Sequence, residues 1–378
     1  MHFVDITMFY AAQGGGVSTY LNAKMRWLTR QSGIQHTIIS PSVPSSNSAL
    51  SVLSLPSFSL PGVPRYRFPQ SVGAAAHLLR TLQPDLIEIG DAGPCAWAAL
   101  KAKRALRVPV VATYHSDLPQ LIESRFGSAV SQLARKYLVQ LYRRCDMLLA
   151  PSNMMVQQLA MMGLPDAIHQ PLGIDSTVFC PQHYDSTLRE QLGIPRDSRL
   201  LIYAGRFTRE KKLDVLIDAV SRLGPPYHLL LVGDGAVLPR TSQTTFIEFV
   251  RSARSLARLL ASCDVLVHPG DCETFGLIVL EAMACGLPVV GTSAGGVAEL
   301  VDDSTGILVT PNCAASLSEG IEAIFQNDLA VMGANARNKA CSRYDWDRIM
   351  PQLLHRYASV LATPQRAELE TELAFAAR

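Results

Sequence analysis

The chain has 378 residues, which is long for one hydrophobic core and suits two domains. Apolar residues make up 48% and charged residues 17% of it, a balance that excludes an intrinsically disordered protein. The net charge is only +2 and there is no dense basic run, so nucleic-acid binding is not expected.

The first predicted strand, at 3–9, lacks the basic region of a signal peptide. The glycine turn Gly14-Gly15-Gly16 follows, and an amphipathic helix is expected from 18 to about 30. Strand, glycine turn and helix in this order favour phosphate binding, because glycine lets the backbone approach a ligand closely. The pattern G-x-G-x-x-G fails at Thr19, which argues against a dinucleotide-binding oxidoreductase. A tight turn without a ligand is the alternative.

Alternating strands and helices fill the rest of the first half. Strands are expected at 36–40, 85–89, 109–113 and 146–150, and helices at 73–82, 96–104, 128–144 and after Ser152. Residues 41–69 are rich in Ser and Pro and are expected to form a long connection, either functional or a plain surface loop. His115 follows the third of these strands. Ligands gather at the carboxyl ends of parallel strands, so His115 is a candidate site residue, although a lone His is more often structural.

A proline-rich and polar run at 181–198 predicts a domain boundary, after which a second α/β series begins. Its strands are expected at 200–204, 228–232, 246–250, 265–267 and 289–290. Arg206 and Lys211 follow the first of these strands, and two cations at a strand end suit a diphosphate. Surface ion pairing with Glu210 or Asp214 is the alternative.

The stretch at 268–296 carries two glutamates with seven residues between them. Glu273 lies in a polar turn, and Glu281 lies inside an apolar run that predicts a helix from about Leu277. The amides of 275–277 would be unpaired donors at the positive end of that helix. A carboxylate on each side of such an anion site suits a nucleotide-sugar, whose diphosphate joins two polyhydroxylated rings. Two unrelated glutamates of an ordinary α/β domain are the alternative.

The run ETFGLIVLEAMACGLPVV resembles the Glu-x7-Glu signature of the retaining glycosyltransferases of family four. The segment PLGID, with Phe179 and Pro181, is similar to the family's GVD…F.P segment. Gly205-Arg206 with Lys211 is similar to its G-R-x4-K-G pattern, with Lys212 in place of the last Gly. The 41–69 connection resembles the LPxxPxYR loop of the sulfoquinovosyl and mannosyl transferase-like members, where Arg65, Tyr66 and Arg67 could contact an acceptor.

The resemblance implies an α/β protein of the GT-B fold, with two Rossmann-like domains facing across a cleft and a C-terminal helix that crosses back. An acceptor-side domain is expected at 1–172, with 356–378 packing on it, and a nucleotide-sugar-binding domain at 173–355. By resemblance, catalytic roles fall on His115, Arg206, Lys211 and Glu273. Donor-binding roles fall on Gly15, Gly16, Val250, Arg251, Thr274, Phe275, Gly276, Leu277 and Glu281.

The activity implied is transfer of a hexose-type sugar from a UDP- or GDP-linked donor, with retention at the anomeric carbon. Neither a metal nor a further cofactor is expected, because cations and helix amides meet the charge on the leaving phosphate. Asp345-Trp346-Asp347 matches the D-x-D metal pattern superficially, but its expected place at a helix N-terminus argues against that role.

A lipid, lipid-linked or polysaccharide acceptor is expected. Residues 1–170 hold 15 Lys and Arg against 8 Asp and Glu, which favours an anionic acceptor or membrane surface, although an ordinary charge fluctuation is the alternative. The basic face of the helix at 128–144 could lie on a membrane, or could simply be solvated. Eight cysteines without a C-x-x-C pair indicate a cytoplasmic protein, which could be peripheral on the inner face of the membrane.

Two other classes share parts of these patterns. An epimerase or phosphorylase of the same fold is one, although such epimerases lack this Glu-x7-Glu arrangement and a phosphorylase needs a pyridoxal lysine. A non-catalytic nucleotide-sugar-binding module is the other. The joint presence of His115, Arg206, Lys211, Glu273 and Glu281 argues against this non-catalytic module.

Overall fold

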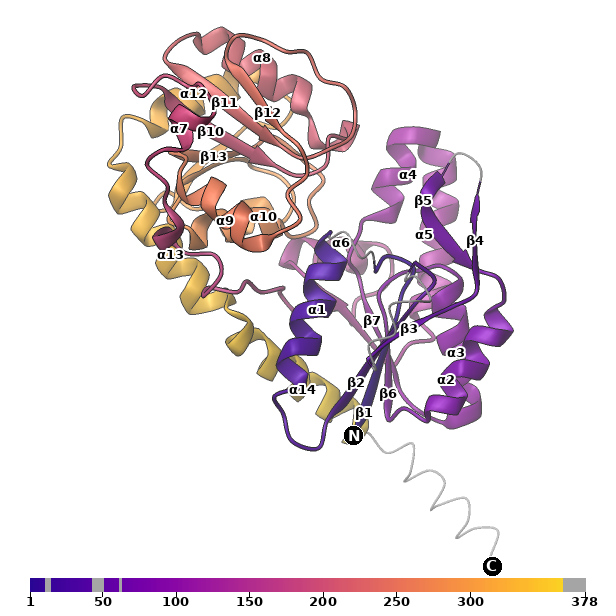
Figure 1. Ribbon diagram of the computed structural model, residues 1–378. Coiled ribbons are helices and arrows are strands. Elements are labelled where there is room, and N and C mark those ends of the chain that lie inside the picture. Colours follow the sequence, from indigo (N-terminus) through magenta and orange to yellow (C-terminus); the bar gives the residue numbers. More distant parts are fainter. Residues whose placement is uncertain (11–14, 43–50, 61–62, 363–378) are drawn as a thin grey trace, which may run out of the picture.

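The structure, a computed structural model, describes residues 1–10, 15–42, 51–60 and 63–362. Its chain forms two α/β units, each built on a parallel sheet (Figure 1). The strands of the first sheet are β1 (His2–Ile6), β2 (Gln35–Ser40), β3 (Val52–Ser54), β6 (Leu86–Ile89), β7 (Val110–Thr113), β8 (Met147–Ala150) and β9 (Ile168–His169). They are arranged in the order β3-β2-β1-β6-β7-β8-β9. The helices of this unit are α1 (Gly16–Leu28), α2 (Val72–Leu82), α3 (Pro94–Leu106), α4 (Leu118–Phe126), α5 (Ser128–Tyr142) and α6 (Asn153–Met161).

The second sheet is also entirely parallel, in the order β12-β11-β10-β13-β14-β15. Its strands are β10 (Arg199–Ala204), β11 (Tyr227–Val232), β12 (Thr244–Ile247), β13 (Val265–His268), β14 (Val289–Thr292) and β15 (Gly306–Val309). Its helices are α7 (Leu188–Gln191), α8 (Leu213–Leu223), α9 (Ala253–Ala261), α10 (Leu277–Ala284), α11 (Val297–Leu300), α12 (Ala314–Ile324) and α13 (Leu329–Tyr344), with short 3-10 turns at Pro181–His183 and Arg209–Lys211. The predicted boundary between 172 and 173 falls in the connection from β9 to β10.

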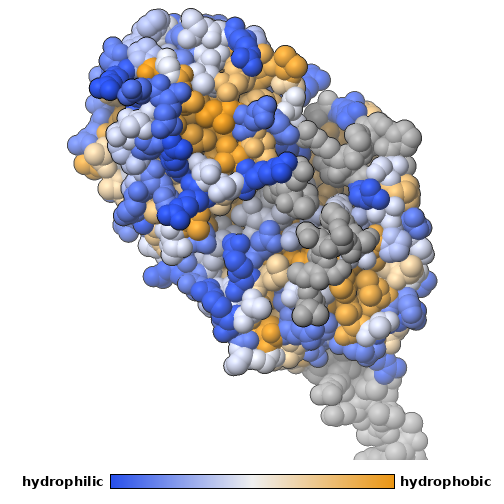
Figure 2. Space-filling view, viewed as in Figure 1, coloured by the Kyte–Doolittle hydropathy of each residue, from blue (hydrophilic) through white to orange (hydrophobic). Residues whose placement is uncertain are grey.

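Each sheet is buried on both faces, as its continuous apolar strands predict. One apolar cluster joins the inner faces of both sheets and includes residues of α1, α9, α10 and α13. Two further clusters fill the outer faces, one under α2, α3 and α5 and one under α8 and α12. The visible surface in Figure 2 is mostly hydrophilic, with hydrophobic patches on both units.

The chain passes between the units twice, and the two passages are hydrogen-bonded to each other. Ile174 N donates to Tyr344 O at 2.8 Å, and Trp346 N donates to Ile174 O at 3.0 Å. A Cβ at Gly173 would lie 2.6 Å from Trp346 Cε3, so only glycine allows this close approach.

The last helix, α14 (Trp346–Ala362), then runs back along the first unit (Figure 1). On that unit, Arg356 Nη2 donates to His169 O at 2.7 Å. The predicted return of the C-terminal helix is therefore confirmed as far as 362, and 363–378 lie outside the described residues.

The long connection expected at 41–69 contains three strands that were not predicted. Within it, β3 adds a parallel edge strand to the first sheet, and β4 (Ser57–Leu60) and β5 (Val63–Pro69) form an antiparallel hairpin. These strands were not predicted because the segment is rich in serine and proline, and both residue types are typical of turns. Arg67 donates through Nε to Ser57 Oγ at 2.8 Å across the hairpin, whereas the side chains of Arg65 and Tyr66 lie outside the described part.

No helix within the described ranges combines the length and the apolar character needed to cross a bilayer.

Candidate active site

Glu273 is the centre of the charged part of the site. It lies in the turn between β13 and α10, and its Oε1 accepts hydrogen bonds from Lys211 Nζ and from His268 Nε2, the latter at 3.1 Å. The side chains of Lys211 and Glu273 are each only 18% exposed. Burial raises the pKa of Glu273, but the Lys211 charge and the His268 hydrogen bond outweigh this effect and hold the pKa well below its usual range. The carboxylate is therefore ionised at neutral pH.

Two glycines of the neighbouring turn set the path of this segment. Gly296 N donates to Glu273 O at 2.7 Å. A Cβ at Gly296 would lie 2.5 Å from Phe275 Cα, and Gly295 has a positive φ of 65°. Neither position accepts a side chain without moving the backbone that carries Glu273. The pair Gly295-Gly296 thus fixes the backbone path of the turn that carries Glu273.

The start of α10 faces the glycine turn of the first unit. Gly276, with φ 99°, precedes the helix, and no side chain of the described residues caps its first amides. A Cβ at Gly16 would lie 3.5 Å from Leu277 Cδ1, so the two segments are within contact distance. Gly15 has φ 118° and immediately precedes α1. The structure therefore brings together Gly15, Gly16 and the helix start, as predicted, whereas the predicted site residue Phe275 is buried and packs on Tyr344.

His115 meets the same segment from the first unit. Its carbonyl accepts from Thr274 Oγ1 at 3.0 Å, and Ser152 Oγ, at the start of α6, donates to Thr274 O at 2.8 Å. Thr274, predicted to bind the donor, thus uses both its hydroxyl and its carbonyl to hold the two units together. The His115 imidazole makes no direct bond to Glu273 among the described contacts.

The environment of His115 keeps its ring neutral. Burial lowers its pKa to about 4, which is well below the usual value near 6.5. The ring packs against Tyr20 with centroids 5.2 Å apart, and its Nε2 is buried with no hydrogen-bond partner in the described part of the chain. A neutral imidazole with one unused nitrogen can donate to or accept from a sugar hydroxyl.

Arg206 and Lys211 differ in their surroundings. The Arg206 side chain is 57% exposed, and its Nη2 lies 3.9 Å from Glu210 Oε1. Arg206 therefore forms a long ion pair with Glu210, the surface partner considered as the alternative, whereas Lys211 pairs with Glu273. Lys212 has φ 52°, a left-handed conformation that favours glycine and matches the motif position where glycine is usual.

Glu281 lies in the middle of α10. Burial raises its pKa to about 8, so the carboxyl is largely protonated at neutral pH. A protonated carboxyl can both donate to and accept from the hydroxyls of a ribose. No described contact joins Glu281 to the charged cluster of Glu273, Lys211 and His268.

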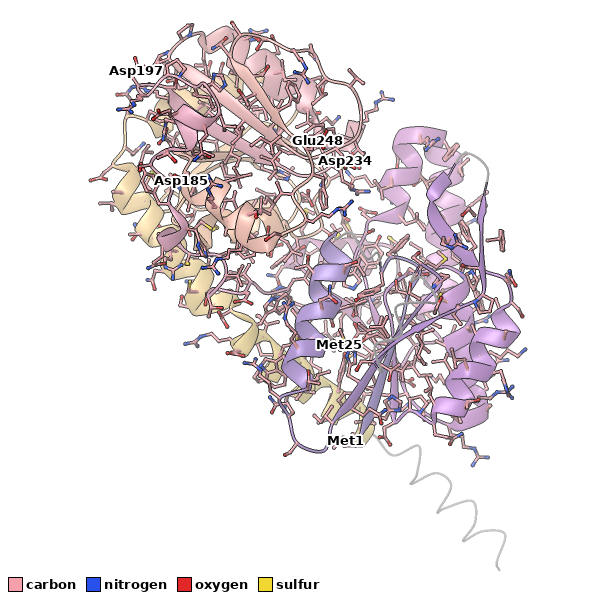
Figure 3. All side chains as sticks on the ribbon, in the orientation of Figure 1. Met1, Met25, Asp185, Asp197, Asp234 and Glu248 are labelled. Carbon is pink, nitrogen blue, oxygen red and sulfur yellow. The ribbon has the colours of Figure 1, made fainter. Side chains whose placement is uncertain are left out.

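The remaining predicted residues, Val250 and Arg251, have different surroundings. Val250 packs against the inner apolar cluster, whereas Arg251 lines a cavity of about 570 Å³ at the carboxyl end of β11 and β12. Asp234 and Glu248 line the same cavity and lie side by side at the edge of the second unit that faces the first (Figure 3). Aromatic side chains complete its wall.

The sequence reasoning missed His268 and Ser152 as parts of this site. The signal for His268 was its place as the last residue of a buried strand, five positions before Glu273. Asp345 and Asp347, rejected as a metal motif, contact Ser176 and Arg30 at the start of α14.

Comparisons with known proteins place these features in context. The family model "Glycosyltransferase Family 4" matches residues 14–177, and "Glycosyl transferases group 1" matches 185–339. A GDP-mannose-dependent alpha-mannosyltransferase of Mycolicibacterium smegmatis is 32% identical over 313 residues, or 80% of this chain and 79% of that protein. The sulfoquinovosyl transferase of Arabidopsis thaliana is 29% identical over 70% of this chain and 54% of its own length.

Among solved structures, HepE from Anabaena in complex with UDP and glucose is similar, with a TM-score of 0.76 and 22% identity. The match covers 94% of this chain and 99% of that one. This likeness confirms the predicted GT-B fold.

Proposed function

The chain belongs to the group 1 glycosyltransferases of family four, as its motifs predicted, and from this premise we propose that it transfers a hexose with retention at the anomeric carbon. The observation that carries the proposal is the convergence of Lys211, Glu273, the α10 start and the Gly15-Gly16 turn. This arrangement offers cations and amides for a diphosphate beside a carboxylate for the sugar.

Arg206, Lys211 and the first amides of α10 meet the charge that develops on the leaving diphosphate. Arg206 is exposed and only loosely paired, so a phosphate can replace Glu210 as its partner at little cost. These groups supply the stabilisation for which other transferases use a metal, so the proposed reaction is metal-independent and needs no further cofactor.

Glu273 and His115 orient the hydroxyls of the donor sugar from opposite sides, and Glu281 binds the ribose hydroxyls. The described residues around Glu273 supply no second carboxylate positioned as a nucleophile. A leaving phosphate oxygen therefore serves as the base that takes the proton of the acceptor hydroxyl.

A GDP-linked hexose is the preferred donor in this proposal. A carboxylate can accept hydrogen bonds from the neighbouring N–H groups of guanine, and an arginine can donate to its O6 and N7. The cavity offers both chemistries, carboxylates from Asp234 and Glu248 and a guanidinium from Arg251. The similar mannosyltransferases, described as GDP-mannose-dependent, support the same choice.

A lipid or lipid-linked acceptor is supported by the face of α4 and α5. Phe126 is 62% and Leu133 is 66% exposed. Arg135 and Lys136 are exposed beside them. Apolar and basic side chains together are typical of a surface that touches an anionic bilayer. The paired variant Phe126→Ser/Leu133→Ser should sediment less with anionic liposomes than the native chain, and equal sedimentation would favour a polysaccharide acceptor.

Donor hydrolysis without an acceptor tests the activity. Purified protein should slowly release sugar from GDP-mannose, with the α-anomer appearing first in a time-resolved NMR spectrum. Release of the β-anomer would contradict retention. Tight binding without any release, even with a lipid extract as acceptor source, would favour the non-catalytic binding module.

A further inference from the structure

His268 is a buried imidazole whose one hydrogen bond goes to the site carboxylate. It is the last residue of β13, its side chain is 2% exposed, and its Nε2 lies 3.1 Å from Glu273 Oε1. Lys211 Nζ donates to the same oxygen. Two donors, one from the 3-10 turn after β10 and one from the end of β13, therefore hold one carboxylate oxygen.

The other ring nitrogen of His268 indicates that the residue is not there for core packing alone. Nδ1 is buried and has no hydrogen-bond partner within the described residues. A structural histidine usually has both nitrogens satisfied, because an unpaired buried polar atom costs about 1–3 kcal/mol. An apolar residue would fill this place at lower cost, so the contact with Glu273 is what the imidazole provides.

The ring is also held firmly in its orientation. The backbone of His268 pairs with Gly291 of β14, and a Cβ at Gly270 would lie 3.1 Å from the ring atom Cε1. The Tyr203 ring lies against it, with centroids 6.3 Å apart. A donor fixed on a central strand positions its acceptor better than one on a long, flexible lysine stem.

We infer that His268 is a positioning residue that keeps Glu273 directed at the donor sugar when Lys211 turns to the diphosphate. This inference rests on the proposed function, in which Lys211 serves the phosphate and Glu273 the sugar. The lysine ammonium must then divide its hydrogen bonds between two anions. The His268 bond does not depend on the phosphate and holds the carboxylate throughout.

The test compares the binding of GDP and GDP-mannose by titration calorimetry. His268→Met removes the donor with a similar volume, and His268→Gln can place an amide donor near the Nε2 position. His228, which is half-buried and bonds Thr245, supplies the matched control His228→Met. A variant that binds GDP like the native chain is folded and has an intact phosphate site.

We expect His268→Met to bind GDP normally. Its ratio of GDP-mannose affinity to GDP affinity should be roughly tenfold lower than that of the native chain, which corresponds to the loss of one hydrogen bond. Turnover should fall by a similar or larger factor, and His268→Gln should recover part of both. If His268→Met does not fold, His268→Asn replaces it, because its shorter amide does not reach Glu273.

The inference is overturned if His268→Met, or His268→Asn in its place, keeps the native ratio of GDP-mannose to GDP affinity and the native turnover. Equal losses of GDP and GDP-mannose affinity would also overturn it, because they would indicate a general structural role. Failure of the proposed function has a different signature, since the native chain would then either bind neither ligand or bind GDP-mannose without releasing mannose.

Discussion

The two units supply charge to the site in different ways. In the first unit, the charges under His115 are paired in the interior, where Lys24 Nζ lies 2.8 Å from Asp5 and 3.0 Å from Glu88. In the second unit, the pair of Lys211 and Glu273 is partly exposed. A set of charges that is buried and paired cannot change partners, whereas a partly exposed pair can be shared with an anion.

The buried set also ties the C-terminal helix to the first unit. Glu88 accepts from the hydroxyls of Tyr20 and Tyr357, and the first of these rings packs on His115. Tyr357 belongs to α14, so the return of this helix completes the network beneath the site. The first unit thus keeps its charges buried and paired, whereas the second carries the charges that the proposed function assigns to the ligand.

Breaking the buried set should have the largest effect on stability. Lys24→Met leaves Asp5 and Glu88 without their cation, which should lower the free energy of unfolding by about 3–5 kcal/mol. The control Arg196→Met removes an exposed partner of Glu190 and should cost at most about 1 kcal/mol. Urea denaturation measures both, and equal effects would remove the distinction between the two kinds of pair.

Removing a site cation should act on rate rather than on stability. Arg206→Ala or Lys211→Ala should reduce turnover roughly 10²–10³-fold, because one preorganised partner of the leaving phosphate is lost. The neighbouring exposed Arg209→Ala is the control and should stay near the native rate. Steady-state assays with GDP-mannose measure this, and near-normal turnover in both site variants would contradict the phosphate assignment.

The two units should also respond to pH in opposite directions. Burial lowers the pKa of His115 from 6.5 to about 4, so the unfolded chain binds the extra proton and stability falls as pH drops through that window. Burial raises the pKa of Glu281 from 4.5 to about 8, so the folded chain holds the extra proton and stability falls as pH rises through that window.

Melting temperatures of the variants between pH 4 and pH 8 should separate these two effects, each on the order of 3–5 kcal/mol over its full window. His115→Gln should flatten the acidic side of the profile, and Glu281→Gln the alkaline side. A native slope on the acidic side in His115→Gln, or on the alkaline side in Glu281→Gln, would show that the residue does not titrate as its burial predicts.

The contact between the units should contribute the smallest effect. Thr274→Val removes the hydroxyl that donates to His115 O while keeping the shape, and should cost about 1 kcal/mol. Ser318→Ala, which removes an exposed bond within α12, is a matched hydroxyl deletion and should be nearly neutral. Thermal unfolding compares the two, and equal losses would mean that Thr274 does not hold the units together.

The sequence predicted both α/β series and the segments that meet at the site, because buried parallel strands and glycine turns leave strong local patterns. It failed for α4 and α13, whose starts depend on single capping residues. Asp117 accepts from Gln120 N, and Asp328 from Ala330 N and Val331 N. Asp is a preferred N-cap residue, so each of these two residues is a sequence signal for the start of its helix.

The pairings within the site could not be read from the sequence. Spacing placed Lys211 and Glu273 at different strand ends, but only the packed sheet shows that they share a bond and that His268 joins them. The buried set of Lys24, Asp5 and Glu88 was missed for the same reason, since its members lie on separate elements and follow no local period.

The central claim, that charge for the ligand comes from the second unit, is tested most directly by a thermal-shift series. GDP, UDP, ADP, GDP-mannose and UDP-glucose are each added to the native chain and to Lys211→Ala. A ligand that binds only the folded state raises the melting temperature by mass action. We expect GDP-mannose to raise the melting temperature of the native chain most and to change that of Lys211→Ala little. Equal shifts in both proteins, or none in the native chain, would contradict it.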